Sequence, residues 1–185
     1  MLADGHRFLR NFIRNPRATG AVAPATAALA RSVGMAAQQA YGRHGSAHAA
    51  AAGRLQVLEL GAGTGVLTHR IAALEPILVE RDARWASLLQ HRFPALEVRH
   101  ECASEALRQL RVPTGIVTSI PLLNNPQAGD LKQLLAEGYV AGLVRFCVLY
   151  TYGWSDPLAG SGFRQARRAS FVARSFPPAH VWVYE

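Results

Sequence analysis

The sequence lacks most of the features that mark membrane-spanning, secreted and disulfide-bonded proteins. No apolar run reaches the ~20 residues that a helix needs to cross a bilayer. The first 20 residues hold four arginines, but the continuous apolar segment of a secretory signal does not follow them. Only two cysteines occur, Cys102 and Cys147, and we expect both to be reduced, buried thiols of a cytosolic protein. The seven histidines show no metal-ligand spacing, so the sequence predicts no metal site.

Apolar residues, by contrast, make up half of the 185-residue chain. This length and composition predict one domain with a substantial buried core. No internal repeat is present, which excludes a repeat architecture.

Charge is unevenly distributed along the chain, whose net charge is +8. Residues 1–54 carry seven arginines and one acid, and residues 160–185 carry four arginines and one acid. The segment between them is nearly neutral. Basic ends indicate a polyanionic partner, either nucleic acid or an anionic membrane surface. The alternative is an arginine-rich composition without a functional target.

Residues 6–17 predict a short amphipathic helix that ends near Pro16. Its apolar sector faces away from its arginines, which suits a helix lying in the membrane interface rather than spanning it. The same stripe is compatible with packing on the domain or with capping a cofactor. The residues that we expect to bind the membrane are Phe8, Leu9, Arg10, Phe12, Ile13 and Arg14.

A second helix is expected from Pro24 to about Tyr41, followed by a connection over residues 42–54. Residues 1–54 thus form an N-terminal helical extension, and residues 55–185 form the main domain. In that domain strand-like runs alternate with helical runs, which predicts an α/β fold with a doubly wound, parallel sheet covered on both faces. The expected strands are 55–60, 76–80, 96–100, 115–120, 142–153, 169–176 and 180–185, and the expected helices are 64–74, 83–93, 104–110 and 130–138.

Three glycines, Gly61, Gly63 and Gly65, follow the first expected strand and precede a helix. In a doubly wound sheet this turn lies where nucleotides bind, and glycine lets a ligand approach the backbone closely. The second strand ends in Glu80, which is spaced to accept hydrogen bonds from ribose hydroxyls, although a solvated strand-end carboxylate is the alternative. Glu59 precedes the glycines, and its charge disfavours a pyrophosphate and favours a cationic cofactor such as S-adenosylmethionine.

The run ELGAGTG with a strand-end acid resembles the motifs of class I S-adenosylmethionine-dependent methyltransferases. The resemblance implies a Rossmann-like, seven-stranded sheet. It also implies that Glu59, Gly61, Gly63 and Gly65 line the methionine end of the cofactor and that Glu80 holds the ribose.

Four longer segments resemble small bacterial phospholipid N-methyltransferases, which convert phosphatidylethanolamine or its methylated intermediates toward phosphatidylcholine. By that resemblance the substrate is a phospholipid, and the protein is cytoplasmic and peripheral to the inner face of the membrane. The segments are FLRNFIRNPRATGAVAPATAALAR, SIPLLNNP, LYTYGWSDPL and VARSFPPAHVWVYE.

The loop after the third strand departs from the methyltransferase pattern. The family offers an acid toward the adenine amine there, but this sequence reads HECASE, with Cys102 at the expected position. Glu101 or Glu105 can substitute for that acid, or either can simply face solvent. We predict Glu101 as the cofactor contact.

Ribosomal RNA adenine dimethylases are the main competing interpretation, because they share the fold and part of the N-terminal pattern. Those enzymes read the base with an Asn-x-Pro-aromatic motif, whereas this chain has Ser119-Ile120-Pro121-Leu122. We also expect no counterpart of their C-terminal helical RNA-binding region, so nucleic acid is the less favoured partner. The sequence is also compatible with a small-molecule methyltransferase and with a cofactor-binding module without catalysis, which only the altered loop supports.

Methyl transfer to an amine depends mainly on positioning, because the cofactor is already activated. The amine must lose a proton, and its methylated products are cations that favour aromatic faces. Tyr152 is the preferred candidate, with Tyr41 and Trp154 as further ones, while Ser119 and Pro121 are expected to shape the pocket floor. Ordinary packing is the alternative role for the three aromatic residues, and a constraint on the loop is the alternative for Ser119 and Pro121. The basic surface is expected to continue at Arg164, Arg167 and Arg168.

Overall fold

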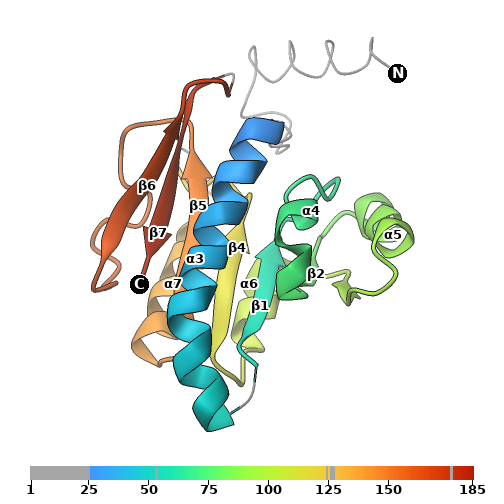
Figure 1. The fold of residues 1–185 in the computed structure, drawn as a ribbon, viewed down its shortest axis with the longest axis horizontal. Coiled ribbons are helices and arrows are strands. Elements are labelled where there is room, and N and C mark those ends of the chain that lie inside the picture. Colours follow the sequence, from blue (N-terminus) through green and yellow to red (C-terminus); the bar gives the residue numbers. More distant parts are fainter. Residues whose placement is uncertain (1–25, 53, 124, 126–127, 176) are drawn as a thin grey trace.

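The computed structural model describes residues 26–52, 54–123, 125, 128–175 and 177–185. Within them seven strands form one sheet in the order β3-β2-β1-β4-β5-β7-β6 (Figure 1). The expected α/β class and the seven strands are confirmed. The strands are β1 (Gln56–Leu60), β2 (Ile77–Val79), β3 (Val98–Arg99), β4 (Thr114–Thr118), β5 (Val144–Thr151), β6 (Ala166–Val172) and β7 (Ala179–Tyr184).

The helices follow the expected order, with two differences in length. The helix expected to end near Tyr41 continues to Ala52, so residues 42–52 are helical rather than a connection. The helix expected from Thr64 begins only at Thr68, because the glycine turn occupies the preceding residues. The helices are α3 (Ala27–Ala52), α4 (Thr68–Ile71), the 3₁₀ turn Ala72–Leu74, α5 (Ala83–Arg92), α6 (Ala103–Arg108) and α7 (Ala128–Val140).

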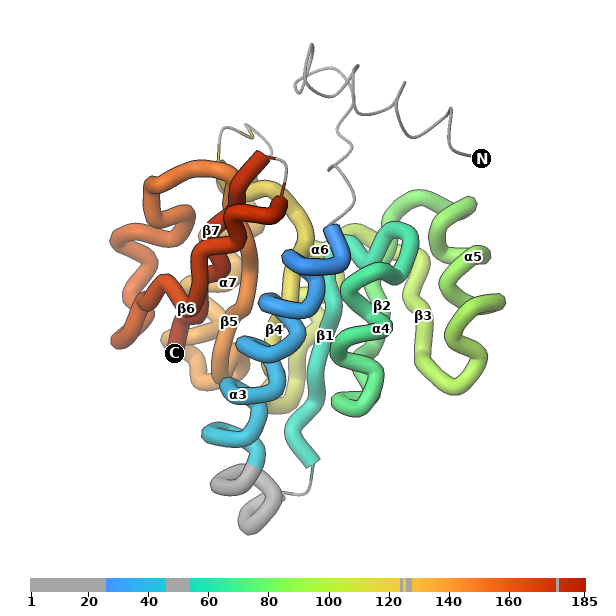
Figure 2. Tube along the Cα trace, turned by 45° about the horizontal axis from the view of Figure 1, so that its top comes forward, coloured from blue at the N-terminus to red at the C-terminus, as the bar shows by residue number. Residues whose placement is uncertain are grey.

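Helices cover both faces of the sheet (Figure 2). Alternate residues of β5 separate the two layers, because successive strand residues point to opposite faces. Phe146, Val148 and Tyr150 pack with α3 and α4, whereas Cys147 and Leu149 pack with α6 and α7. The α5 helix packs beside β2, where Leu89 and Phe93 contact Leu78.

Strand direction departs from the expectation of a parallel sheet at one strand. Strands β1 to β5 are parallel, but β7 pairs antiparallel with both β5 and β6. The chain also returns from β3 at one edge to β4 beside β1. This reversal of strand order creates a crevice at the carboxyl ends of β1 and β4, where doubly wound proteins bind ligands.

The α3 helix shares its core with the sheet, since Leu29 and Val33 pack with Val117 and Val181. Its middle is anchored to the last residue: Glu185 accepts hydrogen bonds from Arg43 at 2.8 Å and from His44 at 3.1 Å. Among the described helices, none combines the length and the apolar character needed to cross a bilayer.

The two cysteines differ in environment. Cys147 is buried as expected, and burial raises the pKa of its thiol to about 12. Cys102 is exposed, contrary to the expectation, because it stands at the start of α6.

Candidate active site

The glycine turn closes the carboxyl end of β1. The backbone N–H groups of Gly61 and Ala62 both donate to the carbonyl of Val79, at 2.9 and 3.3 Å, which ties the turn to β2. All three glycines of the motif adopt positive φ angles, between 55° and 78°. Side-chain-bearing residues rarely take this conformation, so the backbone itself requires glycine here.

The space around the three glycines differs, which refines the sequence interpretation. A Cβ on Gly65 would lie 2.5 Å from the ring of Phe93, and one on Gly61 would lie 2.7 Å from Ile120. A Cβ on Gly63 would meet no atom closer than 4.0 Å. The protein's own side chains therefore approach Gly61 and Gly65, and only Gly63 leaves open space for a ligand.

Glu80 connects the turn to the end of β2. Its carboxylate is buried and accepts the N–H of Gly63 at 2.9 Å and the N–H of Asp82 at 2.9 Å. Asp82 in turn caps α5 by accepting the N–H of Arg84. Glu80 is thus more than a solvated strand end, because it holds the open glycine and carries a negative charge beside it.

Glu59 is fully buried beneath this turn. One carboxylate oxygen accepts the hydroxyl of Thr68 at 2.8 Å, and the other has no hydrogen-bond partner among the described residues. Burial raises the pKa of the carboxyl from 4.5 to about 8, the Thr68 hydrogen bond opposes that rise, and the charge of Glu80 adds to it. An unpartnered buried carboxylate is costly, and a cationic ligand would compensate it.

Two tyrosines of β5 and its end extend the site beside Glu59. The rings of Tyr150 and Tyr152 lie 5.7 Å apart edge to face, and each phenol influences the pKa of the other. Burial raises the pKa of both phenols, and Tyr150 also interacts with Ser119 and with the charge of Glu59. Both tyrosines are therefore neutral near pH 7 and offer hydroxyl groups rather than phenolate charge.

The loop after β4 lies beside the glycine turn, with Ile120 packed against Gly61. Ser119 donates its N–H to the carbonyl of Leu60 at 3.2 Å, which joins the ends of β1 and β4. Pro121 is exposed, and its carbonyl accepts the side chain of Asn125. Leu122 is buried in the core and presents no face to the crevice.

The two glutamates of the loop after β3 make different contacts. Glu105 caps α6 by accepting the N–H of Cys102 at 3.0 Å, so its carboxylate serves the helix. Glu101 accepts the amide of Gln109 through one oxygen, while its other oxygen is buried without a hydrogen-bond partner among the described residues and lies 4.0 Å from the guanidinium of Arg99. Of the two glutamates, Glu101 is the one with an oxygen that makes no hydrogen bond, and its contact with a cofactor stays a prediction.

The remaining aromatic candidates lie apart from this cluster. Tyr41 accepts a hydrogen bond from Arg54, just before β1 begins and therefore at the opposite end of the sheet from the crevice. Trp154 is exposed and packs on His180 and Phe171 beside β7 and β6. The structure thus places Tyr152 against Tyr150, which interacts with Ser119 and Glu59, and gives neither Tyr41 nor Trp154 a contact with this cluster.

Two of the three arginines of the expected basic surface contact other side chains of the protein. Arg167 approaches Glu185 at 3.9 Å, and Arg168 lies over the rings of Trp154 and Trp182. Arg164 is exposed. The expected membrane-binding residues, from Phe8 to Arg14, lie outside the described residues.

Tyr150 and Thr68 belong to the site but are absent from the sequence prediction. The alternation of β5 offered a signal for Tyr150, since it shares a face with Tyr152. Thr68 lies nine positions after Glu59, and no local pattern marks that contact. In the part of the chain that the structure describes, no three His, Cys, Asp or Glu side chains gather where they could hold a metal ion.

No protein-family model matches the chain, and no curated protein matches it in sequence. Solved structures do match it in fold. The 23S rRNA methyltransferase ErmE has a TM-score of 0.54 at 19% identity, with 71% of this chain and 61% of ErmE covered.

Two further structures cover most of both chains. The magnesium protoporphyrin IX methyltransferase of Synechocystis PCC 6803, solved with bound S-adenosylmethionine, has a TM-score of 0.52 at 16% identity, covering 82% of this chain and 79% of that one. A SAM-dependent methyltransferase from Archaeoglobus fulgidus has a TM-score of 0.54 at 14% identity, covering 80% and 93%.

This chain has the fold of S-adenosylmethionine-dependent methyltransferases. The expected Rossmann-like, doubly wound architecture is thereby confirmed. The matches act on different substrates, so the shared fold leaves the substrate of this chain open.

Proposed function

We propose that the protein is an S-adenosylmethionine-dependent N-methyltransferase that acts on the amine head group of a phospholipid at the membrane surface. The observation that carries the cofactor assignment is the buried, half-unpartnered carboxylate of Glu59 beneath the open Gly63. A cationic group beside it would compensate its burial, and the sulfonium and ammonium of S-adenosylmethionine are both cationic.

The residues present suit that cofactor at three places. Glu59 and Gly63 would hold its methionine end, Glu80 would accept its ribose hydroxyls, and Glu101 is available near the adenine side. When bound, the sulfonium supplies an already activated methyl group, so the protein has mainly to orient the acceptor amine.

The hydroxyls of Tyr152 and Ser119 are the groups that we assign to the amine. Because the pKa of Tyr152 is raised, its phenol oxygen stays neutral and can accept a hydrogen bond from an amine N–H. Its ring offers a face for a methylated cation. Pro121 would limit the pocket floor.

A phospholipid amine is favoured over an RNA base by the loop after β4. The adenine-reading motif of the RNA dimethylases requires an Asn and an aromatic ring, and the ring position here is the buried Leu122. RNA methylation is nevertheless the second candidate, because ErmE shares the fold and the chain carries a net charge of +8.

The test is methyl transfer from labelled S-adenosylmethionine to vesicles that contain phosphatidylethanolamine, with a ribosomal RNA transcript as the parallel substrate. We expect label in the lipid fraction, and a loss of at least tenfold in cofactor affinity for Glu80→Ala by calorimetry. Glu137→Ala, which removes an exposed carboxylate near the end of α7, is the matched control. Label in RNA alone would reverse the substrate assignment, and unchanged cofactor binding in Glu80→Ala would remove the site assignment.

A further inference from the structure

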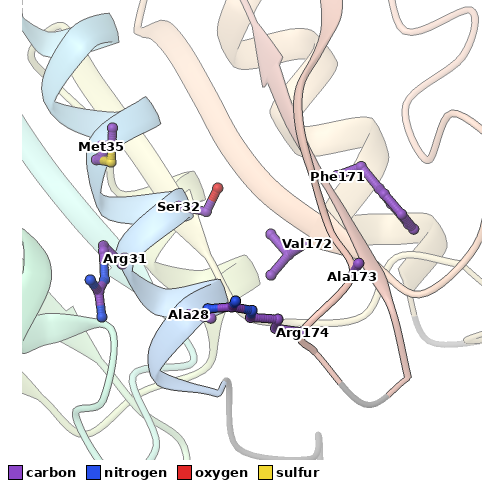
Figure 3. Close-up of a pocket in the computed structure, with 8 residues that line it drawn as sticks. All are labelled: Ala28, Arg31, Ser32, Met35, Phe171, Val172, Ala173 and Arg174. Carbon is purple, nitrogen blue, oxygen red and sulfur yellow. The ribbon is translucent and has the colours of Figure 1, made fainter.

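A groove of about 320 Å³ lies between the first turns of α3 and the end of β6 (Figure 3). Its walls are mainly apolar, with Ala28 and Met35 on the helix and Val172 on the strand. Met35 and Phe171 at its rim are 56% and 53% exposed, although both are large apolar side chains. Exposed apolar side chains that gather around one groove indicate a binding surface.

Two arginines, Arg31 from α3 and Arg174 beyond β6, also line the groove. Both are exposed, and neither guanidinium forms an ion pair or hydrogen bond with another residue in the part of the chain that the structure describes. No acidic residue is among the described residues that line the groove. The groove thus combines apolar walls with two uncompensated positive charges, which complements an amphipathic anion.

The groove opens at the same edge of the sheet as the candidate active site. On β5 and β7, Thr151 pairs with His180, so the next residue, Tyr152, lies level with Ala179. On β7 and β6, Ala179 pairs with Val172. Tyr152 and Val172 also pack on the same core beneath α3. The backbones of Tyr152 and Val172 are thus two strand spacings apart, which is a distance of about 10 Å.

We propose that this groove binds the phosphodiester of a phospholipid at the bilayer surface, with Arg31 and Arg174 contacting the phosphate and Met35 and Phe171 entering the interface. The inference rests on the proposed function, since it assigns the phosphate of the lipid whose amine is methylated. In an ethanolamine head group two methylene groups separate the phosphate oxygen from the amine. The apolar walls favour a lipid over RNA, which would gain little from them.

Full-length Arg31→Glu/Arg174→Glu tests the proposal in sedimentation with phosphatidylcholine vesicles that contain phosphatidylglycerol. The matched control is Lys132→Glu/Arg145→Glu, which changes the net charge equally but lies on α7 and at the start of β5. Each arginine near an anionic surface is worth about 1 kcal/mol, so we expect the groove variant to bind roughly tenfold or more weakly and the control to stay within about twofold. Calorimetry with S-adenosylmethionine checks that the crevice is intact in both.

An equal loss in both variants, or no loss in the groove variant, would overturn the groove assignment. Loss of binding to a fluorescent RNA hairpin with vesicle binding unchanged would assign the groove to nucleic acid instead. Vesicle binding requires no methyl transfer, which separates this proposal from the proposed function. If the wild-type protein methylates no lipid but only the groove variant loses vesicle binding, the function fails and the groove stands. If lipid is methylated and the groove variant has an unchanged KM for it, the proposed function stands and the groove assignment fails.

Discussion

At the residue scale, the active-site candidates owe their properties to burial. Glu59 and Glu80 are both buried carboxylates at neighbouring strand ends, but only Glu80 receives two backbone N–H donors. Glu59 receives one hydroxyl and keeps one bare oxygen. Burial therefore destabilises the ionised form of Glu59 in the folded protein without ligand.

This difference predicts a pH-dependent stability that Glu59→Gln removes. The folded pKa of about 8 lies above the ordinary value of 4.5, so the folded state binds the proton more tightly than the unfolded state. The stabilisation is complete below about pH 4.5 and is lost as the pH rises through 8, by about 3–5 kcal/mol in total. Urea denaturation at pH 5, 7 and 9 should show that the free energy of unfolding of the wild type falls as the pH rises. In Glu59→Gln the fall between pH 5 and pH 9 should be smaller by several kcal/mol. Parallel curves for the two proteins would contradict it.

The glycine turn predicts a second effect at this scale. Gly65→Ala would force a positive φ and also press a methyl group against Phe93, whereas Gly142→Ala forces a similar φ of 74° with no atom within 4 Å. We expect Gly65→Ala to destabilise the protein by about 1–3 kcal/mol more than Gly142→Ala, since overpacking adds to backbone strain. Equal unfolding free energies for the two variants would show that Phe93 yields freely.

The sequence predicts those crevice residues whose positions depend only on neighbouring residues in the chain. Gly63 and Glu80 belong to a turn and a strand end that the chain order brings together. The approach of Phe93 to Gly65 could not be predicted, because it depends on how α5 packs across 28 residues of chain. The same holds for the unpartnered oxygen of Glu59, which depends on burial rather than on residue type.

At the scale of elements, α3 departs most from what the sequence predicts. Its second half contains Gly42 and Gly45, which weaken helix propensity and favour a connection. Tertiary contacts override that propensity: His44 stacks on Phe146 at 5.9 Å, and Arg43 and His44 both donate hydrogen bonds to Glu185. Helix ends set by such distant partners are not visible in a local pattern.

Two glycines of α3 should respond to alanine with opposite signs. A Cβ on Gly34 would lie 2.6 Å from Cβ of Arg70 on α4, whereas a Cβ on Gly42 would meet nothing within 4 Å. We expect Gly34→Ala to destabilise by about 1–2 kcal/mol through overpacking, and Gly42→Ala to stabilise by up to about 1 kcal/mol through helix propensity. Thermal and urea unfolding measure both, and stabilisation by Gly34→Ala would show that the α3–α4 contact is loose.

At the scale of the whole molecule, the order and number of strands along the chain followed from the alternation of apolar and helical runs. The position of β7 between β5 and β6 did not, because alternation indicates a strand but neither its direction nor its neighbour. Because β7 lies between them, β6 and the arginine-lined groove stand two strand spacings away from β5.

The net charge of +8 predicts strongly salt-dependent binding to anionic vesicles. The Debye length falls from about 8 Å at 0.15 M salt to about 3 Å at 1 M, so most of the attraction should be screened. We expect the fraction bound to phosphatidylglycerol-containing vesicles to fall at least tenfold over this range, while binding to phosphatidylcholine alone stays low. Salt-independent sedimentation would mean that apolar insertion dominates.

The indole of Trp154 gives the molecule a built-in optical reporter. It is 74% exposed, whereas Trp182 is buried and Trp85, which is 40% exposed, stands on α5 and is replaced by Phe in the variant that isolates the Trp154 signal. Trp154 also packs on the ring of Phe171, the side chain at the groove rim. Emission from this one indole should therefore shift toward shorter wavelength, and lose its sensitivity to aqueous quenchers, when a hydrocarbon phase covers that rim.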